Sequence, residues 1–501
     1  MRASVLILVP VLVAAPRQAV PAPSQAEIIG SKKFTESCVL AEIAKSALQR
    51  AGLPAEVRSS IGGTIILWEA LRQGGINVYP EYTGTIREVI LKERSSSGPE
   101  DAADLEGLRR RLESYGIGIT GKLGFNNTYA LVMRRARARA LGIRQISDLR
   151  GHPDLVCGLG HEFLGRSDGW APLCARYGLH MRDVRGVDHT LGYVALAKGE
   201  IDLMDAYSTD ARIAEDDLLV LRDDLHFFPR YDAVFLYRLD ADPRVPAVLR
   251  TLEGTLDERR ITDLNAAAER TKDYARGAAM YFHQESGGDG GRAVANIARW
   301  TGRHLLLVAV SLFASILVGV PLGIWASRPG WIGESVIGAT GLIQTVPSLA
   351  LLALLVSVPF LGISPATAII ALFLYGLLPI VRNTASGIQD IPSPMRESAE
   401  ALGLEPRACL TKVFLPLASR SILAGIKTSA IIAVGTATLA ALIGAGGLGE
   451  PILSGLNLND RVLILEGALP AAALALAVQL LFIALDRVLI PKGLRLNSAR
   501  S

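Results

Sequence analysis

The stretch SGGDGG, residues 286–291, divides the chain into two halves of different composition. Before it, residues 27–285 carry frequent charges, as in RRRLESYG and LDERRITDLNAAAERTKD. After it, from His304 onward, long apolar runs dominate. Glycines and small polar residues are typical of a flexible linker. The sequence therefore predicts a soluble domain at 27–285, a linker at 286–303 and a membrane domain at 304–490.

The overall charge excludes one class of partner. The formal net charge is +4 over 501 residues, which is too small for the basic footprint of a nucleic-acid-binding protein. The length allows two or three domains, each with its own core. Half of the residues are hydrophobic, which fits a chain with one soluble and one membrane part.

The N-terminus has the pattern of an export signal. Residues 1–26 begin with Arg2, continue as an apolar run to Ala15 and end in small residues before Glu27. The apolar run is too short to span a bilayer, which needs roughly 20 residues, and small residues suit a signal-peptidase site. We expect a signal peptide at 1–26 that exports the soluble domain; an uncleaved anchor is the alternative.

The cysteines indicate no metal site. Cys38, Cys157, Cys174 and Cys409 form neither a CxxC motif nor a cluster with metal-ligand spacing. We therefore expect no metal and no cofactor. Cys157 and Cys174 fall in the same exported region, where a disulfide is possible and two separate buried thiols fit the pattern at least as well.

Five apolar segments of the second half are long enough to cross a membrane. They lie near 304–326, 335–357, 365–381, 421–446 and 463–486. Pro321, Pro347 and Pro379 fall inside them, which neighbouring helices tolerate. The glycine-rich stretch after Leu442 would add a sixth span if it re-enters the membrane.

Basic residues predict the orientation of these segments. The connection 383–419 and the tail 491–501 are both rich in Arg and Lys, and such loops stay on the cytoplasmic side. With five spans, the first then starts on the outer side, where an exported N-terminal domain requires it. Arg292, Arg299 and Arg303 argue weakly against this. The chain is thus predicted to be a multi-pass protein of the cell (inner) membrane with its soluble domain outside the cytoplasm.

The cytoplasmic connection contains the stretch RESAEALGLEPRACLTKVFLPLA, residues 396–418. It indicates a short helix, a break at Gly403, a second helix opened by Pro406, and a return to the membrane at Leu415 and Pro416. A DNA-binding helix-turn-helix has a similar local pattern. A connection of this length between two spans leaves no room for that domain, so we discount it.

One stretch imitates a nucleotide site. GIGITGKL, residues 116–123, has the G-x-x-x-x-G-K spacing of a phosphate-binding loop. Leu123 stands where Ser or Thr should bind magnesium, and the stretch lies in the exported half, away from cytoplasmic ATP. We expect the match to be accidental, and any ATPase to be a separate polypeptide.

The exported half alternates short apolar strands with helical stretches. The predicted strands are EIIGS, INVYP, YALVM, DLVCGLG, IDLMDAY and AVFLYR. This alternation favours an α/β fold with mainly parallel sheets. The length suits two lobes with a cleft at the carboxyl ends of the strands, where loops converge on a ligand.

The loops at these strand ends repeat a few residue types. GSKKFTES has Lys32 and Lys33, YPEYTGT has Tyr82 and Thr85, FNNTYAL has Tyr129, EFLGRSDGW has Arg166, DAYSTD has Tyr207, and FFPRYDAVF has Tyr231. Each residue alone has an ordinary explanation, because tyrosine is common in strands and a single cation is usually solvated.

In order and wording, these segments resemble the substrate-binding proteins for glycine betaine, choline and related quaternary amines, over nearly all of 27–285. The second half resembles the matching ABC permeases, notably in QTVPSLALLALL, LLPIVRNTASGI and LIGAGGLGEPI. The resemblance implies an α/β two-lobed periplasmic-binding-protein fold of type II, followed by an all-α polytopic membrane domain of the ABC importer permease type.

The resemblance also implies a binding site. The family's box of four tyrosines maps onto Tyr82, Tyr129, Tyr207 and Tyr231. The lysine and arginine that hold the substrate carboxylate map onto Lys32 and Arg166, with Thr85 assisting, and Lys33 is the alternative to Lys32. A trimethylammonium group has no N–H to donate, and its diffuse charge suits the faces of aromatic rings. Because the ring face binds, replacing any one tyrosine by Phe should cost little.

Residues 396–418 resemble the EAA loop of ABC permeases. Glu397, Ser398, Ala399 and Gly403 stand at the motif positions, and Ser398 replaces the usual alanine. In that family the loop is a coupling helix that docks on a separate ATPase subunit. The resemblance implies that ATPase as a partner, together with a permease homodimer.

These observations predict the substrate-binding and permease subunit of an ABC importer for betaine-like osmoprotectants, with no catalytic residues of its own. We considered three alternatives to this function, of which the first stays open. The same architecture could import a bulkier betaine such as carnitine or ergothioneine. A receptor for such ligands should carry a cytoplasmic signalling domain, and few residues follow the last span. An enzyme acting on choline has no triad, metal cluster or cofactor motif in its favour.

Overall fold

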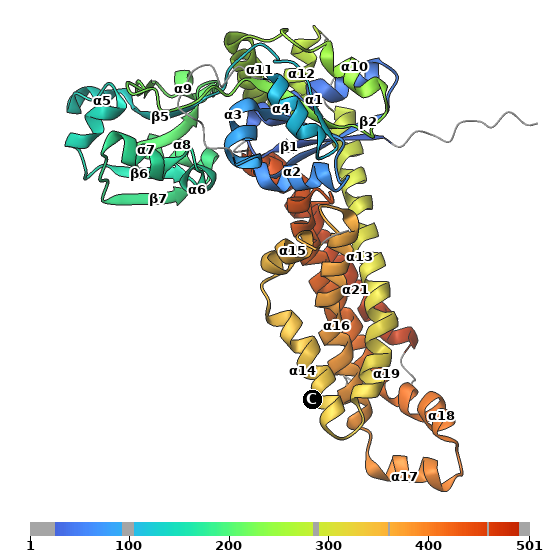
Figure 1. Cartoon of the computed structure of the whole chain (residues 1–501). Helices are drawn as coiled ribbons and strands as arrows, with labels where there is room; N and C mark the ends of the chain where they lie inside the picture. The colour runs from blue at the N-terminus through green and yellow to red at the C-terminus, as the bar shows by residue number, and fades with distance from the viewer. Residues whose placement is uncertain (1–25, 93–104, 284–289, 359–360, 458–459, 490–501) are drawn as a thin grey trace, which may run out of the picture.

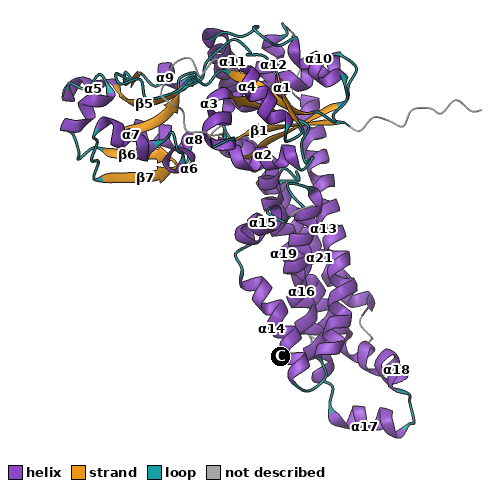
Figure 2. Cartoon of the chain, in the orientation of Figure 1, coloured by secondary structure: helices purple, strands orange, loops and turns teal. Residues whose placement is uncertain are grey.

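The computed structural model describes residues 26–92, 105–283, 290–358, 361–457 and 460–489. The expected tail and almost all of the expected signal peptide lie outside the described residues. Figure 1 shows an α/β part made of two lobes and a long helical part that extends away from one of them. Figure 2 shows that the strands are confined to the lobes.

Lobe 1 is built on a five-stranded sheet with the order β2-β1-β3-β10-β4. β1 and β3 are buried at nearly every position, as expected for central strands covered on both faces. The strands are β1 (Glu27–Lys32), β2 (Ala55–Gly62), β3 (Val78–Tyr82), β4 (Ile117–Ile119) and β10 (Ala233–Arg238). The helices are α1 (Thr35–Arg50), α2 (Thr64–Arg72), α3 (Thr83–Thr85), α4 (Leu105–Glu113), α10 (Arg244–Arg250), α11 (Glu258–Thr271) and α12 (Tyr274–Tyr281).

Lobe 2 repeats the plan with a five-stranded sheet of order β7-β6-β8-β5-β9. Its strands are β5 (Tyr129–Arg134), β6 (Val156–Gly160), β7 (Asp183–Val187), β8 (Leu203–Tyr207) and β9 (Leu218–Val220). Its helices are α5 (Arg135–Leu141), α6 (His161–Gly165), α7 (Trp170–Tyr177), α8 (His189–Lys198) and α9 (Arg212–Glu215). The chain enters lobe 2 after β4 and leaves it before β10, so two crossings join the lobes.

The sheets are mixed, which corrects the expectation of mainly parallel sheets. β1 pairs in parallel with β2 and β3, whereas β10 is antiparallel to both β3 and β4. In lobe 2, β6 is parallel to β7 and β8, whereas β5 is antiparallel to β8 and β9. The strands with reversed direction, β5 and β10, are the ones that directly follow a crossing. A chain that arrives from the other lobe enters the sheet from the cleft side, which explains the reversal.

Within the described residues, the helical part contains four helices that are long and apolar enough to cross a membrane, or five spans if a bent pair counts as one. Its helices are α13 (Gly290–Ala326), α14 (Trp331–Thr345), α15 (Ser348–Val356), α16 (Pro365–Gln389), α17 (Ser393–Ala401), α18 (Pro406–Ala408), α19 (Leu415–Thr436), α20 (Gly449–Asn457) and α21 (Arg461–Leu489). The glycine-rich stretch after Leu442 leads into the short helix α20 rather than into a further long one.

The segment expected as one span at 335–357 is bent. α14 and α15 meet at an angle of 92°, and Pro347 occupies the position before α15. Proline has no N–H to continue a helix, which explains why the break falls there. Pro321 and Pro379, by contrast, lie inside α13 and α16 without ending them.

Part of the expected linker 286–303 is helical, which is a second correction. α13 begins at Gly290 and continues without interruption to Ala326. Residues 284–289 lie outside the described part of the chain. The two glycines at the start of α13 do not stop it, because the next turns contain good helix formers and an apolar face with Trp300, which is 8% exposed.

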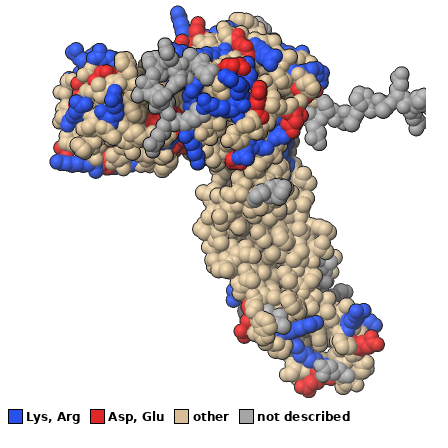
Figure 3. All heavy atoms as spheres, in the orientation of Figure 1, with Lys and Arg blue, Asp and Glu red and all other residues tan. Residues whose placement is uncertain are grey.

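The lobes and the loop between α16 and α19 lie at opposite ends of the helical part (Figure 1). On the face shown in Figure 3, charged residues cover the lobes and the far end, whereas the stretch between them is free of blue and red. Lobe 1 packs against the end of the helical part opposite the α17–α18 loop. There Ile61 and Leu67 share one apolar cluster with Leu307 and Ile363. This arrangement fits a membrane domain with the lobes on one side and the α17–α18 loop on the other.

Candidate functional site

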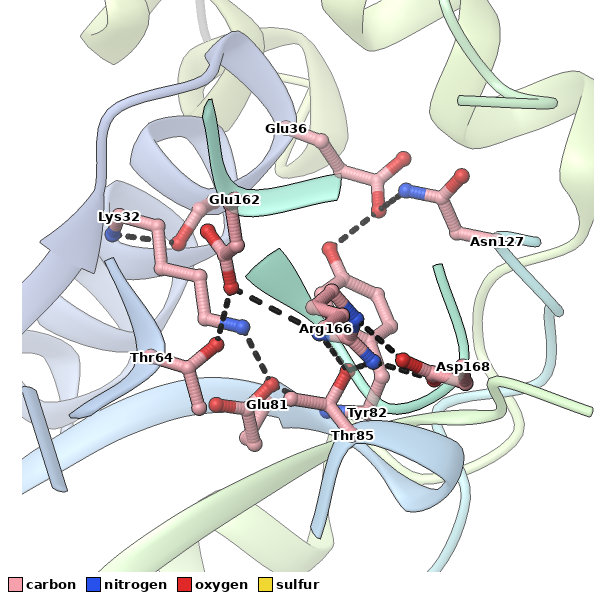
Figure 4. Close-up of polar contacts among 11 residues, drawn as sticks. Lys32, Glu36, Thr64, Glu81, Tyr82, Thr85, Asn127, Glu162, Arg166 and Asp168 are labelled. Carbon is pink, nitrogen blue, oxygen red and sulfur yellow. Dashed lines mark hydrogen bonds and ion pairs between the residues drawn. The ribbon is translucent and has the colours of Figure 1, made fainter. Parts of the chain in front are cut away.

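A narrow cavity between the two lobes gathers the residues that the sequence singled out. It is lined by all seven predicted residues, Lys32, Tyr82, Thr85, Tyr129, Arg166, Tyr207 and Tyr231, and by Phe34, Asn127 and Glu162. Lys33, the alternative to Lys32, is exposed. Figure 4 shows the polar contacts that surround this cavity.

The antiparallel pairings explain why the tyrosines meet. In lobe 2, Tyr129 begins β5 and faces Tyr207, which ends β8, across the strand pair. In lobe 1, Tyr82 ends β3 and faces Ala233, two residues after Tyr231. In an antiparallel pair the end of one strand lies beside the start of the other. Each lobe therefore presents two tyrosines at the edge of its sheet that faces the cleft.

Tyr129 occupies the centre of the aromatic group. Its ring centroid lies 5.2 Å from that of Tyr207 and 5.9 Å from that of Tyr231, the latter in a T-shaped contact. On its other side it contacts Phe163 at 4.9 Å. Phe34 contacts Tyr207 at 4.7 Å. These separations are those of well-packed aromatic pairs, so the rings form one apolar wall contributed by both lobes.

Both predicted cations are already paired with carboxylates. The Lys32 ammonium lies 2.6 Å from Glu81, which is fully buried. The Arg166 guanidinium donates to Asp168 through Nε and Nη2, at 2.6 and 2.5 Å. Such a two-point contact fixes the plane of the guanidinium. It leaves Nη1 facing the cavity, where the hydroxyl oxygen of Thr85 is 3.4 Å away and a carboxylate oxygen of Glu162 is 3.6 Å away.

Two of the tyrosine hydroxyls donate to buried carboxylates. Tyr82 donates to Glu36 and Tyr231 donates to Asp168, each at 2.6 Å. The hydroxyls of Tyr129 and Tyr207 lie in the same cavity and donate to no described carboxylate. Burial raises the pKa of Glu36 to about 6, and the hydrogen bonds that it accepts lower it in part.

These contacts revise the expectation that any tyrosine can be replaced by Phe at little cost. We expect Tyr82→Phe to destabilise the lobes by about 1–3 kcal/mol, because Glu36 loses a donor in a buried site. Tyr129→Phe should cost less, because its hydroxyl donates to no described carboxylate. Thermal melts of the full chain in detergent measure the difference, and equal melting temperatures for the two variants would contradict it.

The lobes touch each other across the cavity. The Thr64 hydroxyl of lobe 1 donates to Glu162 of lobe 2 at 2.7 Å, and Arg166 of lobe 2 contacts Thr85 of lobe 1. These contacts and the narrowness of the cavity describe a closed arrangement. A ligand can reach the rings only when the lobes move apart.

The sequence reasoning missed several residues of the site. Phe34, Asn127 and Glu162 lie in the same loops as predicted residues, so the clustering of polar and aromatic residues there was the available signal. Glu36 and Asp168 lie in two of these loops as well, GSKKFTES and EFLGRSDGW, but their burial had no signal in the sequence, because a single acidic residue near a strand end is usually solvated.

The four cysteines are free thiols in the structure. The disulfide considered for Cys157 and Cys174 is therefore not formed. Among the described residues, no group of His, Cys, Asp and Glu is arranged to hold a metal ion.

The α17–α18 loop has the local geometry that its sequence indicated. Gly403 has a left-handed backbone with φ of 71°, and α18 begins at Pro406. Ala399 is 3% exposed and anchors α17 to the rest of the loop, whereas Glu397 and Ser398 are exposed. The loop thus exposes polar residues together with Met395 and Leu402, at the end of the molecule away from the lobes (Figure 1).

Two family models match the chain. Residues 28–285, about half of it, match the substrate-binding domain of ABC-type glycine betaine transport systems. Residues 319–493 match the binding-protein-dependent transport system inner membrane component. The chain belongs to these two families. It joins the substrate-binding and permease components of a glycine betaine-type ABC importer in one membrane protein, with the type II two-lobed fold before the helical domain.

Two relatives of the membrane half agree with this assignment. The chain is 39% identical over 216 residues to the glycine betaine/carnitine/choline transport system permease protein OpuCB of Bacillus subtilis. The matched region covers 43% of this chain and 95% of the relative. The chain is also 39% identical over 202 residues to the osmoprotectant import permease protein OsmW of Salmonella typhimurium, covering 40% and 94%. A crystal structure of a glycine betaine/carnitine/choline ABC transporter is 26% identical, covers 51% of this chain and 97% of that chain, and has a TM-score of 0.44.

Proposed function

We propose that the cavity binds a small quaternary amine of the glycine betaine or choline class, which the membrane domain then imports. The observation that carries the proposal is the convergence of seven residues, from six separate stretches of sequence, on one cavity between the lobes. Four of them supply aromatic rings, which we call the aromatic end, and two supply positive charge, which with Thr85 we call the cationic end. The two ends adjoin, because the Arg166 guanidinium lies 5.2 Å from the Tyr129 ring and the Lys32 ammonium 5.5 Å from the Tyr82 ring.

The aromatic end suits the ammonium group. Its positive charge is spread over methyl groups that cannot donate strong hydrogen bonds, and each ring face contributes about 0.5–2 kcal/mol. Tyr82, Tyr129, Tyr207 and Tyr231 are the rings that we assign to this contact. Several such contacts are needed to reach a micromolar affinity of about −8 kcal/mol.

The cationic end suits a carboxylate. Arg166 keeps Nη1 directed toward Thr85 after Asp168 has taken its other edge, and Lys32 lines the same cavity. A zwitterion such as glycine betaine would use both ends, with its carboxylate against Arg166, Thr85 and Lys32. Choline has no carboxylate and would use the aromatic end alone.

Transport requires partners that this chain does not supply. We assign residues 383–419 as the coupling loop, with Glu397, Ser398, Ala399 and Gly403 meeting a separate ATPase subunit on the cytoplasmic side. We assign a homodimer of the membrane domain as the translocating unit. Opening of the lobes would release the ligand to this dimer, and ATP-driven closure of the ATPase pair would reverse the access of the pathway.

The proposal is tested by calorimetry on the full chain in detergent. We expect calorimetry to rank glycine betaine, choline and carnitine by affinity and to give at least one of them a micromolar dissociation constant. Tyr129→Ala should weaken that ligand at least tenfold, because the central ring is lost. Tyr115→Ala is the matched control, since Tyr115 is a tyrosine exposed outside the cavity. Micromolar binding that survives Tyr129→Ala would refute the site.

The orientation is tested by cysteine labelling in intact cells and in permeabilised cells. A cysteine placed within 286–291 should react with an impermeant thiol reagent from outside. A cysteine at Ser398, which is exposed, should react only after permeabilisation. The native cysteines provide the background signal, and the variant without an added cysteine is the control. The opposite pattern would overturn both the exported signal and the fused architecture.

A further inference from the structure

Glu36 is a buried carboxylate that forms no ion pair with any described lysine, arginine or histidine. Its side chain is 2% exposed. It accepts hydrogen bonds from the Tyr82 hydroxyl, the Asn127 amide, the Thr209 hydroxyl and the Asn265 amide. All four donors are neutral, so they solvate the negative charge without neutralising it.

Three other buried carboxylates around the cavity are paired with cations. Glu81 lies 2.6 Å from Lys32, and Asp168 lies 2.5 Å from Arg166. Asp232, at the crossing next to the cavity, contacts Lys122 and Arg230, each at 2.8 Å. Buried charges in proteins are normally paired, because an isolated one is costly to desolvate. Among the described residues of this region, Glu36 and Asp205 are the exceptions. Asp205 is 4% exposed and accepts the Gly160 N–H, whereas Glu36 is hydrogen-bonded to residues that line the cavity.

The position of Glu36 relates it to the cavity. Figure 4 shows it on the far side of the Tyr82 hydroxyl, with a second contact to Asn127. Tyr82 and Asn127 both line the cavity. The carboxylate is thus one hydrogen bond behind the wall to which we assign the ammonium group. A phenol that donates to a carboxylate also has a more negative ring, which strengthens its attraction for a cation.

We propose that Glu36 is the counter-ion of the ligand's quaternary ammonium group and acts through Tyr82. This inference rests on the proposed function, and it names the charge of the ligand as a determinant of specificity. It makes Glu36 a positioning and electrostatic residue that does not touch the ligand. The four neutral donors hold the Glu36 carboxylate in place in the closed arrangement but leave its negative charge uncompensated. The charge that compensates it is the ammonium group of the bound ligand.

The experiment compares a cation with its uncharged carbon analogue. Choline and 3,3-dimethyl-1-butanol have nearly the same shape, and only choline is charged. We expect the wild-type full chain to bind choline at least tenfold more tightly. Glu36→Gln should weaken choline about 10- to 50-fold, the range expected for removal of a unit charge that acts over several ångströms at an effective dielectric of about 20. It should change the affinity for the alcohol less than twofold.

Two further variants separate charge from structure. Exchanging the acid and the amide in the double variant Glu36→Gln/Asn265→Asp keeps one negative charge in the cluster, and it should restore most of the preference for choline. Asp202→Asn is the matched control, because Asp202 is a carboxylate that accepts the Val156 N–H at the opposite end of β8. It should change neither affinity.

The outcomes distinguish this inference from the proposed function. If the wild type binds no quaternary amine, the proposed function fails and the inference fails with it. If the wild type binds choline but Glu36→Gln weakens both ligands equally, only the inference fails, because Glu36 then supports the fold. A wild type that prefers choline by less than tenfold would also overturn it, even if neither Glu36 variant folds. Loss of choline affinity alone, regained in the exchanged variant, supports it.

Discussion

Replacing Gly403 by Trp is expected to abolish uptake while the affinity of the cavity for its ligand changes less than twofold. Gly403 joins α17 to α18 with a left-handed φ of 71°, and no other atom lies near the position of an added Cβ. A side chain there therefore finds room within this chain. It would protrude from the exposed loop into the groove of the ATPase subunit that we propose as partner.

A graded series separates this steric effect from local strain. Gly403→Ala adds about 1–2 kcal/mol of left-handed strain but little bulk, so it should keep most of the uptake. Gly254→Trp is the matched control, because Gly254 is also exposed and left-handed, with φ of 66° and open space around it, but lies in lobe 1. Glu397→Lys, which reverses an exposed charge on α17, should resemble Gly403→Trp. Uptake in proteoliposomes containing the ATPase that persists in both loop variants would refute the coupling assignment.

The second large effect is expected for the pair Arg166→Ala/Asp168→Asn. It should weaken glycine betaine about 10- to 100-fold and choline less than about threefold. A hydrogen bond to a charged group is worth about 1.5–3 kcal/mol, and only glycine betaine has a carboxylate to lose it. Calorimetry with the two ligands on one protein measures the contrast directly.

Both members of the ion pair are changed for a physical reason. Arg166 and Asp168 are 7% and 6% exposed, and removal of the arginine alone would leave an unpaired buried carboxylate at a cost of about 3–5 kcal/mol. Arg166→Ala alone is therefore expected to weaken both ligands through the fold. Equal losses for both ligands in the double variant would mean that Arg166 has only a structural role.

The predicted strands illustrate how far local patterns reach. The six strands expected from apolar runs correspond to β1, β3, β5, β6, β8 and β10. β2, β4, β7 and β9 were missed, since they are edge strands or are shorter, and β7 has exposed residues at its centre. The direction of β5 and β10 was also missed, because strand polarity depends on how the chain crosses between lobes.

The residues assigned to the site were predicted from the resemblance of their loops to a known family, because residue types alone left each with an ordinary explanation. Lys32 and Arg166 line one cavity, but their pairing with Glu81 and Asp168 was not foreseen, and their role in binding stays a prediction. Nothing in the stretch YPEYTGT predicts that Glu81 is buried, or that Thr85, four positions later, faces Arg166. The side chains' environments follow from packing against other segments.

The sequence by itself determined the division into an α/β half and a membrane half, the resemblance to one transporter family and the tyrosines that face the cleft. Each of these depends on residue type, on local periodicity or on the wording of a short motif. The tertiary structure alone decided which acid lies behind which ring. Tyr82 meets Glu36 across 46 positions of sequence, and Thr209 meets the same carboxylate across 173. Such contacts are set by strand register and lobe closure, which no local preference encodes.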